Sequence, residues 1–77
     1  MREGSVAAVY EMSRFTAFDS AAVIRDWAKT APLEDLKMER LRMLEQAHAF
    51  PRYRKLCQWL EDVADLRGLS LVHVTKA

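Results

Sequence analysis

Residues 51–68, PRYRKLCQWLEDVADLRG, carry the clearest helical pattern in the chain. Pro51 suits the first turn of a helix, where its missing N–H group costs nothing, and Gly68 is a natural left-handed terminator. The pattern between them predicts an amphipathic helix from Pro51 to about Arg67. Its broad apolar face is expected to hold Tyr53, Leu56, Cys57, Leu60, Val63 and Ala64, widened by Trp59 and Leu66.

Two further helices are predicted before this one. Asp19 and Ser20 offer N-cap oxygens to a first helix that ends near Thr30. Pro32 then opens a second helix, which can run to Phe50 before Pro51. The first helix has Val23, Ile24, Trp27 and Ala28 on one face, and the second has Leu33, Leu36, Leu41, Met43, Leu44, Ala47 and Phe50.

The two ends of the chain favour short strands. Residues 5–18 alternate in polarity around Val6, Ala8 and Tyr10, which suits a strand. A helix is the alternative for this segment, because some of the same side chains also share a helical face. Residues 69–74 alternate as well and contain β-branched residues. We therefore predict a mainly α fold over residues 1–77, a three-helix compact domain whose short N- and C-terminal strands can pair as a small ribbon.

The length of the chain limits its core. A domain of 77 residues buries about 60% of the surface that its unfolded chain exposes. Cys57 is the single cysteine, which excludes an intramolecular disulfide, and with His48 and His73 it gives no spacing typical of a zinc site. We expect no metal and no cofactor, and we expect association with another chain to supply the missing stability.

Two of the predicted helices have apolar faces wider than one small core requires. On the last helix the apolar arc covers roughly 180°, against about 100° for a helix packed on the outside of a single core. A homodimer or a docked partner is therefore expected, and the alternative is that the first helix and the strands cover the excess. Arg40 lies within the arc of the second helix, where it either reaches solvent at the edge or pairs with an acid of another chain.

Arg52, Tyr53, Arg54 and Lys55 form a basic run with an aromatic residue inside it. At the start of a helix these cations oppose the helix dipole. One interpretation is an anion site for a phosphate or an acidic protein surface, and the other is an ordinary solvated turn. Trp59 is either a core residue or an exposed interface anchor.

The sequence contains few of the features that catalysis requires. It has neither a glycine-rich phosphate loop nor a nucleophile elbow, and Cys57 falls on an apolar face, where a buried thiol is inert. No apolar run approaches the roughly 20 residues of a membrane helix. The N-terminus shows no convincing signal peptide, which with the lone cysteine predicts a cytoplasmic location. We therefore predict that the protein is not an enzyme.

The function expected from these features is that of a small protein-binding regulator or inhibitor, which occupies a surface of a larger protein. Phage and mobile-element accessory proteins commonly fill this role. This expectation comes from what genomes generally encode and not from these residues. The expected contact residues are Arg40, Arg52, Tyr53, Arg54, Lys55 and Trp59. No motif is specific enough to identify a family.

The alternative is a small DNA-binding transcriptional regulator. The tight junction at residues 50–52 would suit a helix-turn-helix unit. However, Glu61, Asp62 and Asp65 lie on the outer face of the helix that follows, where they would repel phosphate. The net charge of only +1 also predicts weak attraction to nucleic acid.

Overall fold

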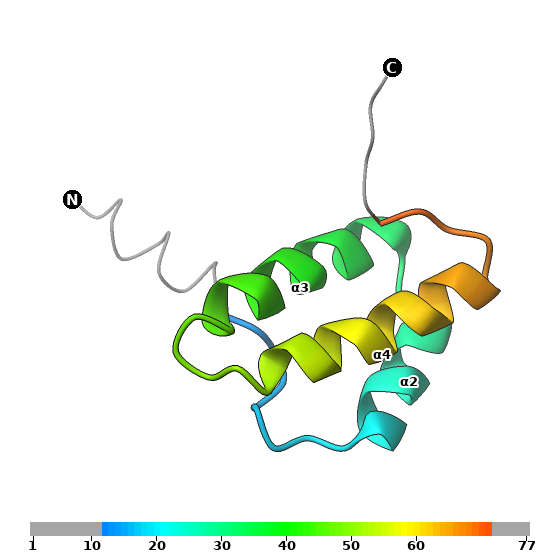
Figure 1. The fold of residues 1–77 in the computed structure, drawn as a ribbon. Helices are drawn as coiled ribbons and strands as arrows, with labels where there is room; N and C mark the ends of the chain where they lie inside the picture. The colour runs from blue at the N-terminus through cyan, green and yellow to red at the C-terminus, as the bar shows by residue number, and fades with distance from the viewer. Residues whose placement is uncertain (1–11, 72–77) are drawn as a thin grey trace.

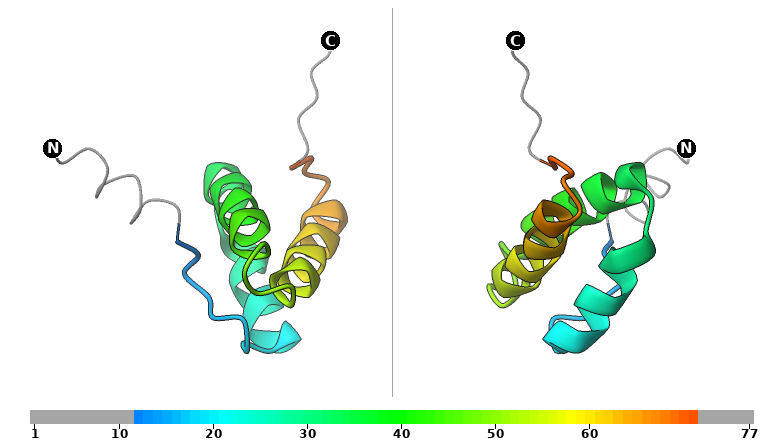
Figure 2. Two further views of the ribbon diagram at one scale, coloured as in Figure 1. Left: turned by 60° about the vertical axis from the view of Figure 1, so that its left-hand side comes forward. Right: turned by 90° about the vertical axis from the view of Figure 1, so that its right-hand side faces the viewer.

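The computed structural model describes residues 12–71, which form three α-helices and no strand (Figure 1). The helices are α2 (Ala21–Thr30), α3 (Leu33–Gln46) and α4 (Tyr53–Leu66). α4 packs against both α2 and α3, and the views of Figure 2 show it together with them from two further sides. The mainly helical, three-helix fold is therefore confirmed.

The α2 helix begins and ends as its sequence predicts. The hydroxyl of Ser20 accepts a hydrogen bond from the Val23 N–H group at 3.4 Å and so caps the helix. At the other end, the Ala31 N–H group donates to the carbonyl of Trp27 at 3.1 Å. Pro32 follows and cannot continue the helix, because it lacks an N–H group.

The α3 helix starts at Leu33, directly after Pro32, and ends at Gln46. The sequence prediction extended it to Phe50. Instead, the Phe50 N–H group donates to the carbonyl of Gln46 at 2.9 Å in a turn that leads to Pro51. The His48 and Ala49 N–H groups donate to carbonyls only three residues earlier, those of Glu45 at 3.3 Å and Gln46 at 3.1 Å, so the chain tightens out of the α-helix before it reaches Pro51.

The α4 helix buries the face that its sequence predicts. Its buried residues are Tyr53, Leu56, Cys57, Leu60, Val63 and Ala64. Gly68 then adopts a φ of 75°, the left-handed conformation that glycine takes without strain. The Leu69 N–H group bonds to the carbonyl of Ala64 at 2.9 Å, which closes the helix end as the glycine predicts.

The core is built where the three helices meet. α2 contributes Ile24 and Ala28, and α3 contributes Leu36 and Met43. Phe15, Ala17, Ala31, Ala47 and Leu71, from outside the helices, complete it. Trp27 and Trp59 are half-buried and pack against this core, which agrees with the interpretation of Trp59 as a core residue.

Arg67 joins the ends of two helices. Its Nη1 atom donates to the carbonyls of Ala28 at 2.7 Å and Ala31 at 2.8 Å. These carbonyls lie in the last turn of α2 and just beyond it, where a helix leaves its C=O groups without partners. The end of α4 is thereby fixed to the end of α2.

The predicted terminal strands are not supported. The described part of the first one, residues 12–18, forms bends and turns, and residues 69–71 of the second are not a strand either. Their other residues, 5–11 and 72–74, lie outside the described range. Within the described range, several residues of this first segment bond instead to side chains of α3 and to Arg52 and Tyr53; they are Ser13, Arg14, Phe15, Ala17 and Asp19.

Candidate protein-binding surface

Residues 12–20 form an irregular segment, here called the strap, that side chains of α3 hold in place. The backbone N–H group of Ser13 donates to Oε1 of Gln46, and the Ser13 hydroxyl donates to the carboxylate of Glu39. The N–H group of Arg14 donates to the same carboxylate at 2.9 Å. The beginning of the strap is thus held by polar bonds to the middle and end of α3.

Glu39 is the one charged side chain that is buried among the described residues, and it is only 1% exposed. A buried carboxylate is expensive unless it is paired and hydrogen-bonded. Here it accepts the two strap hydrogen bonds, and Nη1 of Arg42 lies 3.5 Å from its other oxygen. The burial of Glu39 is therefore explained by its contacts with the strap.

Side chains at the start of α4 hold the other half of the strap. The hydroxyl of Tyr53 donates to the carbonyl of Phe15 at 2.7 Å and accepts from Nε2 of Gln46 at 3.3 Å. Nη1 of Arg52 donates to the carbonyl of Ala17, and to that of Asp19 at 3.1 Å. Burial raises the pKa of the Tyr53 phenol, an effect that the bond from Gln46 partly offsets.

Aromatic contacts fix the strap against α2. The rings of Phe15 and Trp27 meet edge to face with their centroids 5.5 Å apart. The guanidinium of Arg14 lies over the Trp27 ring, 4.5 Å from its centroid. Phe15 is buried, whereas Arg14 is exposed. The strap therefore contributes to the core while it presents a cation to solvent.

A pocket of about 320 Å³ lies along the strap and is here called the strap pocket. Three large apolar side chains that line it are exposed: Phe18 by 84%, Met12 by 60% and Phe50 by 55%. The other described lining residues are Ser13, Arg14, Phe15, Thr16, Ala17, Gln46 and Tyr53. Two aromatic rings and a methionine thus gather on one exposed site, which is unusual for a surface that contacts only water.

The contact residues expected from the sequence are not all available to a partner. Arg40 pairs within the chain, because its Nε atom lies 2.7 Å from Oε2 of Glu61 across the α3–α4 contact. Tyr53 is buried beneath the strap. Trp59 is half-buried and has the Arg52 guanidinium 5.7 Å from its ring centroid.

Arg52, Arg54 and Lys55 are exposed at the start of α4. The structure brings Arg52 to the strap, whereas neither Arg54 nor Lys55 lines the strap pocket. Of the three cations in the basic run, Arg52 bonds to the strap although it does not itself line the pocket, and its role there is structural.

That structural role of Arg52 is testable against its neighbour. We expect Arg52→Ala to lower the free energy of unfolding by about 1 kcal/mol, because two hydrogen bonds from a charged donor to strap carbonyls are lost. We expect Arg54→Ala, also at an exposed position, to change it by less than about 0.5 kcal/mol. Urea unfolding measures both. Equal effects of the two substitutions would contradict a role for Arg52 in holding the strap.

Cys57 is buried on α4, where its Sγ atom lies 3.4 Å from Oε2 of Glu61. Burial raises the pKa of the thiol to about 12, and the nearby Glu61 carboxylate adds to the effect. A thiol that stays protonated is a poor nucleophile. This agrees with the sequence-based interpretation of Cys57 as a core residue.

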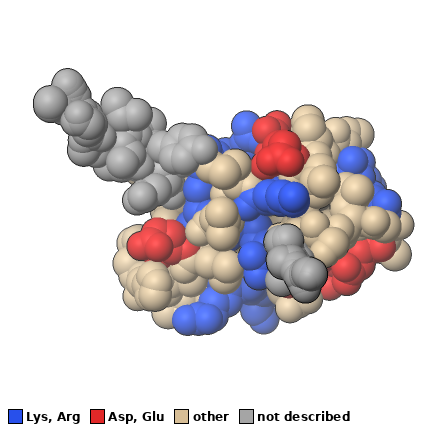
Figure 3. Space-filling model, turned by 90° about the horizontal axis from the view of Figure 1, so that it is seen from above, with Lys and Arg blue, Asp and Glu red and all other residues tan. Residues whose placement is uncertain are grey.

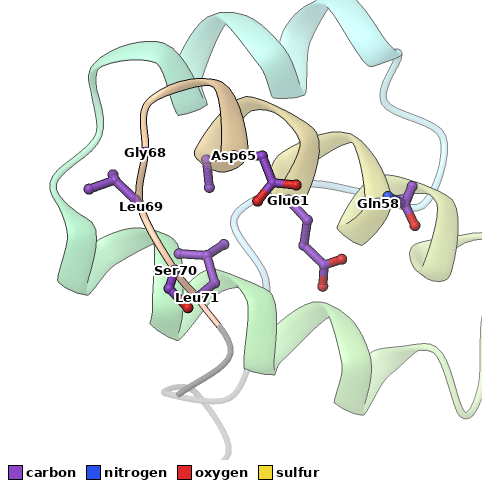
Figure 4. Close-up of a pocket in the computed structure, with 8 residues that line it drawn as sticks. Gln58, Glu61, Asp65, Gly68, Leu69, Ser70 and Leu71 are labelled. Atoms are coloured by element: carbon purple, nitrogen blue, oxygen red, sulfur yellow. The ribbon is translucent and has the colours of Figure 1, made fainter. Parts of the chain in front are cut away.

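A second pocket, of about 380 Å³, lies between α4 and the segment that follows it (Figure 4). Gln58, Glu61 and Asp65 line it from the helix, and Gly68, Leu69, Ser70 and Leu71 line it from the following segment. The carboxylate of Glu61 is already paired with Arg40. Among the described residues, no group of three or more His, Cys, Asp or Glu side chains is placed to hold a metal ion.

Charges of both signs share the upper surface of the molecule. Figure 3 shows Lys and Arg side chains gathered across the middle of this face, with Asp and Glu on either side of them. A DNA backbone is attracted by an unbroken positive surface. The mixture seen here is less suited to that role.

Comparisons with protein-family models, with curated proteins and with solved structures found no match to this chain. Within residues 12–71, no helix is both long and apolar enough to cross a membrane.

The sequence analysis did not predict the strap pocket or the burial of Glu39 under the strap. The sequence did contain one indication that Glu39 is buried. It lies one helical turn from Leu36 and one from Met43, on the side of α3 that faces the core. No comparable signal existed for Phe18, whose exposure depends on the path of the strap.

Proposed function

We propose that this protein is a small non-enzymatic regulator that binds a larger protein through the strap pocket. The observation that supports the proposal is the exposure of Phe18, Phe50 and Met12 around one pocket. Aromatic side chains and methionine are enriched in protein interfaces, and burying them against a partner is favourable.

The hydrogen bonds that hold the strap in place also support its use as a binding site. Ser13, Phe15 and Ala17 are fixed to α3 and α4 by hydrogen bonds, so the pocket between the exposed side chains has a defined floor. A surface that is already ordered loses less conformational entropy when it binds. The pocket therefore offers a partner both apolar area and a preformed shape.

Affinity capture with matched variants tests the proposal. The full chain is used as bait in cells that produce it, alongside Phe18→Ser/Phe50→Ser and the control Leu66→Ser. Leu66 is 87% exposed but does not line the strap pocket. We expect one protein to be retained by the unmodified chain and by the control and lost from the double variant. Equal retention by all three would contradict the proposal.

Circular dichroism accompanies the capture experiment. Because all three substituted side chains are exposed, we expect the helical signal to remain unchanged in each variant. A loss of partner with an intact helical signal then reports on the surface itself.

A further inference from the structure

The charged residues beside the strap pocket indicate which kind of partner the pocket would bind. Arg14 is the only charged residue among its described lining residues, and its side chain is exposed. Arg52 is exposed too, and it bonds to the carbonyl of Ala17, which also lines the pocket. The Arg14 guanidinium lies 4.5 Å from the centroid of the Trp27 ring, and the Arg52 guanidinium bonds to the Ala17 and Asp19 carbonyls, so both cations lie beside the strap.

The acidic groups close to the strap are engaged by the strap itself. The carboxylate of Glu39 is buried and accepts hydrogen bonds from Ser13 and Arg14. The carboxylate of Asp19 accepts the N–H group of Thr16 at 2.9 Å. Among the described charged residues that line the pocket or bond to the strap, Arg14 and Arg52 are exposed, whereas Glu39 is buried and Asp19 is half-buried.

We propose that the strap pocket binds a segment of another protein in which large apolar side chains are flanked by Asp or Glu. The apolar side chains would pack against Phe18, Phe50 and Met12, and the carboxylates would pair with Arg14 and Arg52. Arginine suits this role because its planar guanidinium can bind a carboxylate through two parallel hydrogen bonds. A volume of about 320 Å³ is at the small end for ligand pockets, which favours one or two anchoring side chains.

This inference rests on the proposed function and adds the chemistry of the partner. It is tested with two short, fluorescein-labelled amphipathic peptides. One has Leu and Phe on one face and Glu on the other, and the second has Lys at every Glu position. Fluorescence anisotropy with the full chain measures both affinities. We expect the Glu peptide to bind about tenfold more tightly at low salt, and high salt to reduce the ratio.

Matched variants locate the effect. Arg14→Gln should lower the ratio of the two affinities from about tenfold to about threefold, the part that Arg52 supplies. Arg25→Gln, at an exposed arginine of α2 outside the pocket, should leave the ratio unchanged. Phe18→Ser should weaken the binding of both peptides. Binding of the Glu peptide that is insensitive to Phe18→Ser would overturn the site.

The remaining outcomes separate this inference from the proposed function. Equal binding of the two peptides, or tighter binding of the Lys peptide, would overturn the acidic partner, and the capture experiment would still decide the proposed function. Light scattering over a dilution series tests the homodimer expected from the sequence. A dimer that is lost in Phe18→Ser would make a second copy the occupant and would also overturn the acidic partner.

Discussion

Replacing Glu39 with alanine is expected to lower the free energy of unfolding by about 3 kcal/mol. The substitution removes the acceptor for the Ser13 hydroxyl and the Arg14 N–H group, and it takes away one partner of Arg42. It also leaves a void beneath the strap, since Glu39 is almost fully buried. Domains of this size have a total stability on the order of 5–10 kcal/mol, so the loss is a large share of it.

Urea unfolding followed by circular dichroism measures the effect of Glu39→Ala. The matched control is Glu45→Ala, because Glu45 lies on the same helix but is exposed. We expect the control to change the free energy of unfolding by less than about 0.5 kcal/mol. If Glu39→Ala were as mild as the control, Glu39 would not be holding the strap.

The Cys57 thiol is expected to be strongly protected from thiol reagents in the folded protein. With its pKa raised to about 12, almost none of the thiol is ionised at pH 8. An unperturbed cysteine has a pKa of about 8.5, so the thiolate fraction falls on folding on the order of a thousandfold. The reaction with Ellman's reagent should therefore be slower by a comparable factor in buffer than in denaturing urea. Rates within tenfold of each other would contradict the burial of Cys57.

The same raised pKa gives a pH dependence of stability with a definite sign. Above about pH 8.5 the unfolded chain loses the Cys57 proton while the folded chain retains it. Because the folded state then binds more protons, the free energy of unfolding falls as the pH rises between about 8.5 and 12. Cys57→Ala should remove this contribution, which parallel urea titrations of the two chains would measure.

Local periodicity was sufficient to predict α4 and its buried face. Each buried residue of α4 has another buried residue three or four positions away, and Pro51 and Gly68 mark the two ends. The cap at Ser20 and the start of α3 after Pro32 were predicted for the same reason, since each depends on a few adjacent residues.

The strap was not predicted, because its path depends on contacts between distant parts of the chain. Alternating polarity suggested a strand through residues 12–18, yet the partners of this segment are side chains such as Glu39, Arg52 and Tyr53. Ser13 lies 26 positions before Glu39, and Phe15 lies 38 before Tyr53. Arg40 illustrates the same limit, since its pairing with Glu61 could be identified only once α3 and α4 were placed together.

The most direct test of the central claim, that the strap pocket binds another protein, is site-specific photo-cross-linking in cells that produce the chain. A benzophenone amino acid replaces Phe18 in one sample and Leu66 in another, both of which are exposed positions. We predict a discrete cross-linked product with a different protein from position 18 and none from position 66. The absence of any product at position 18, or the same product from both positions, would contradict the claim.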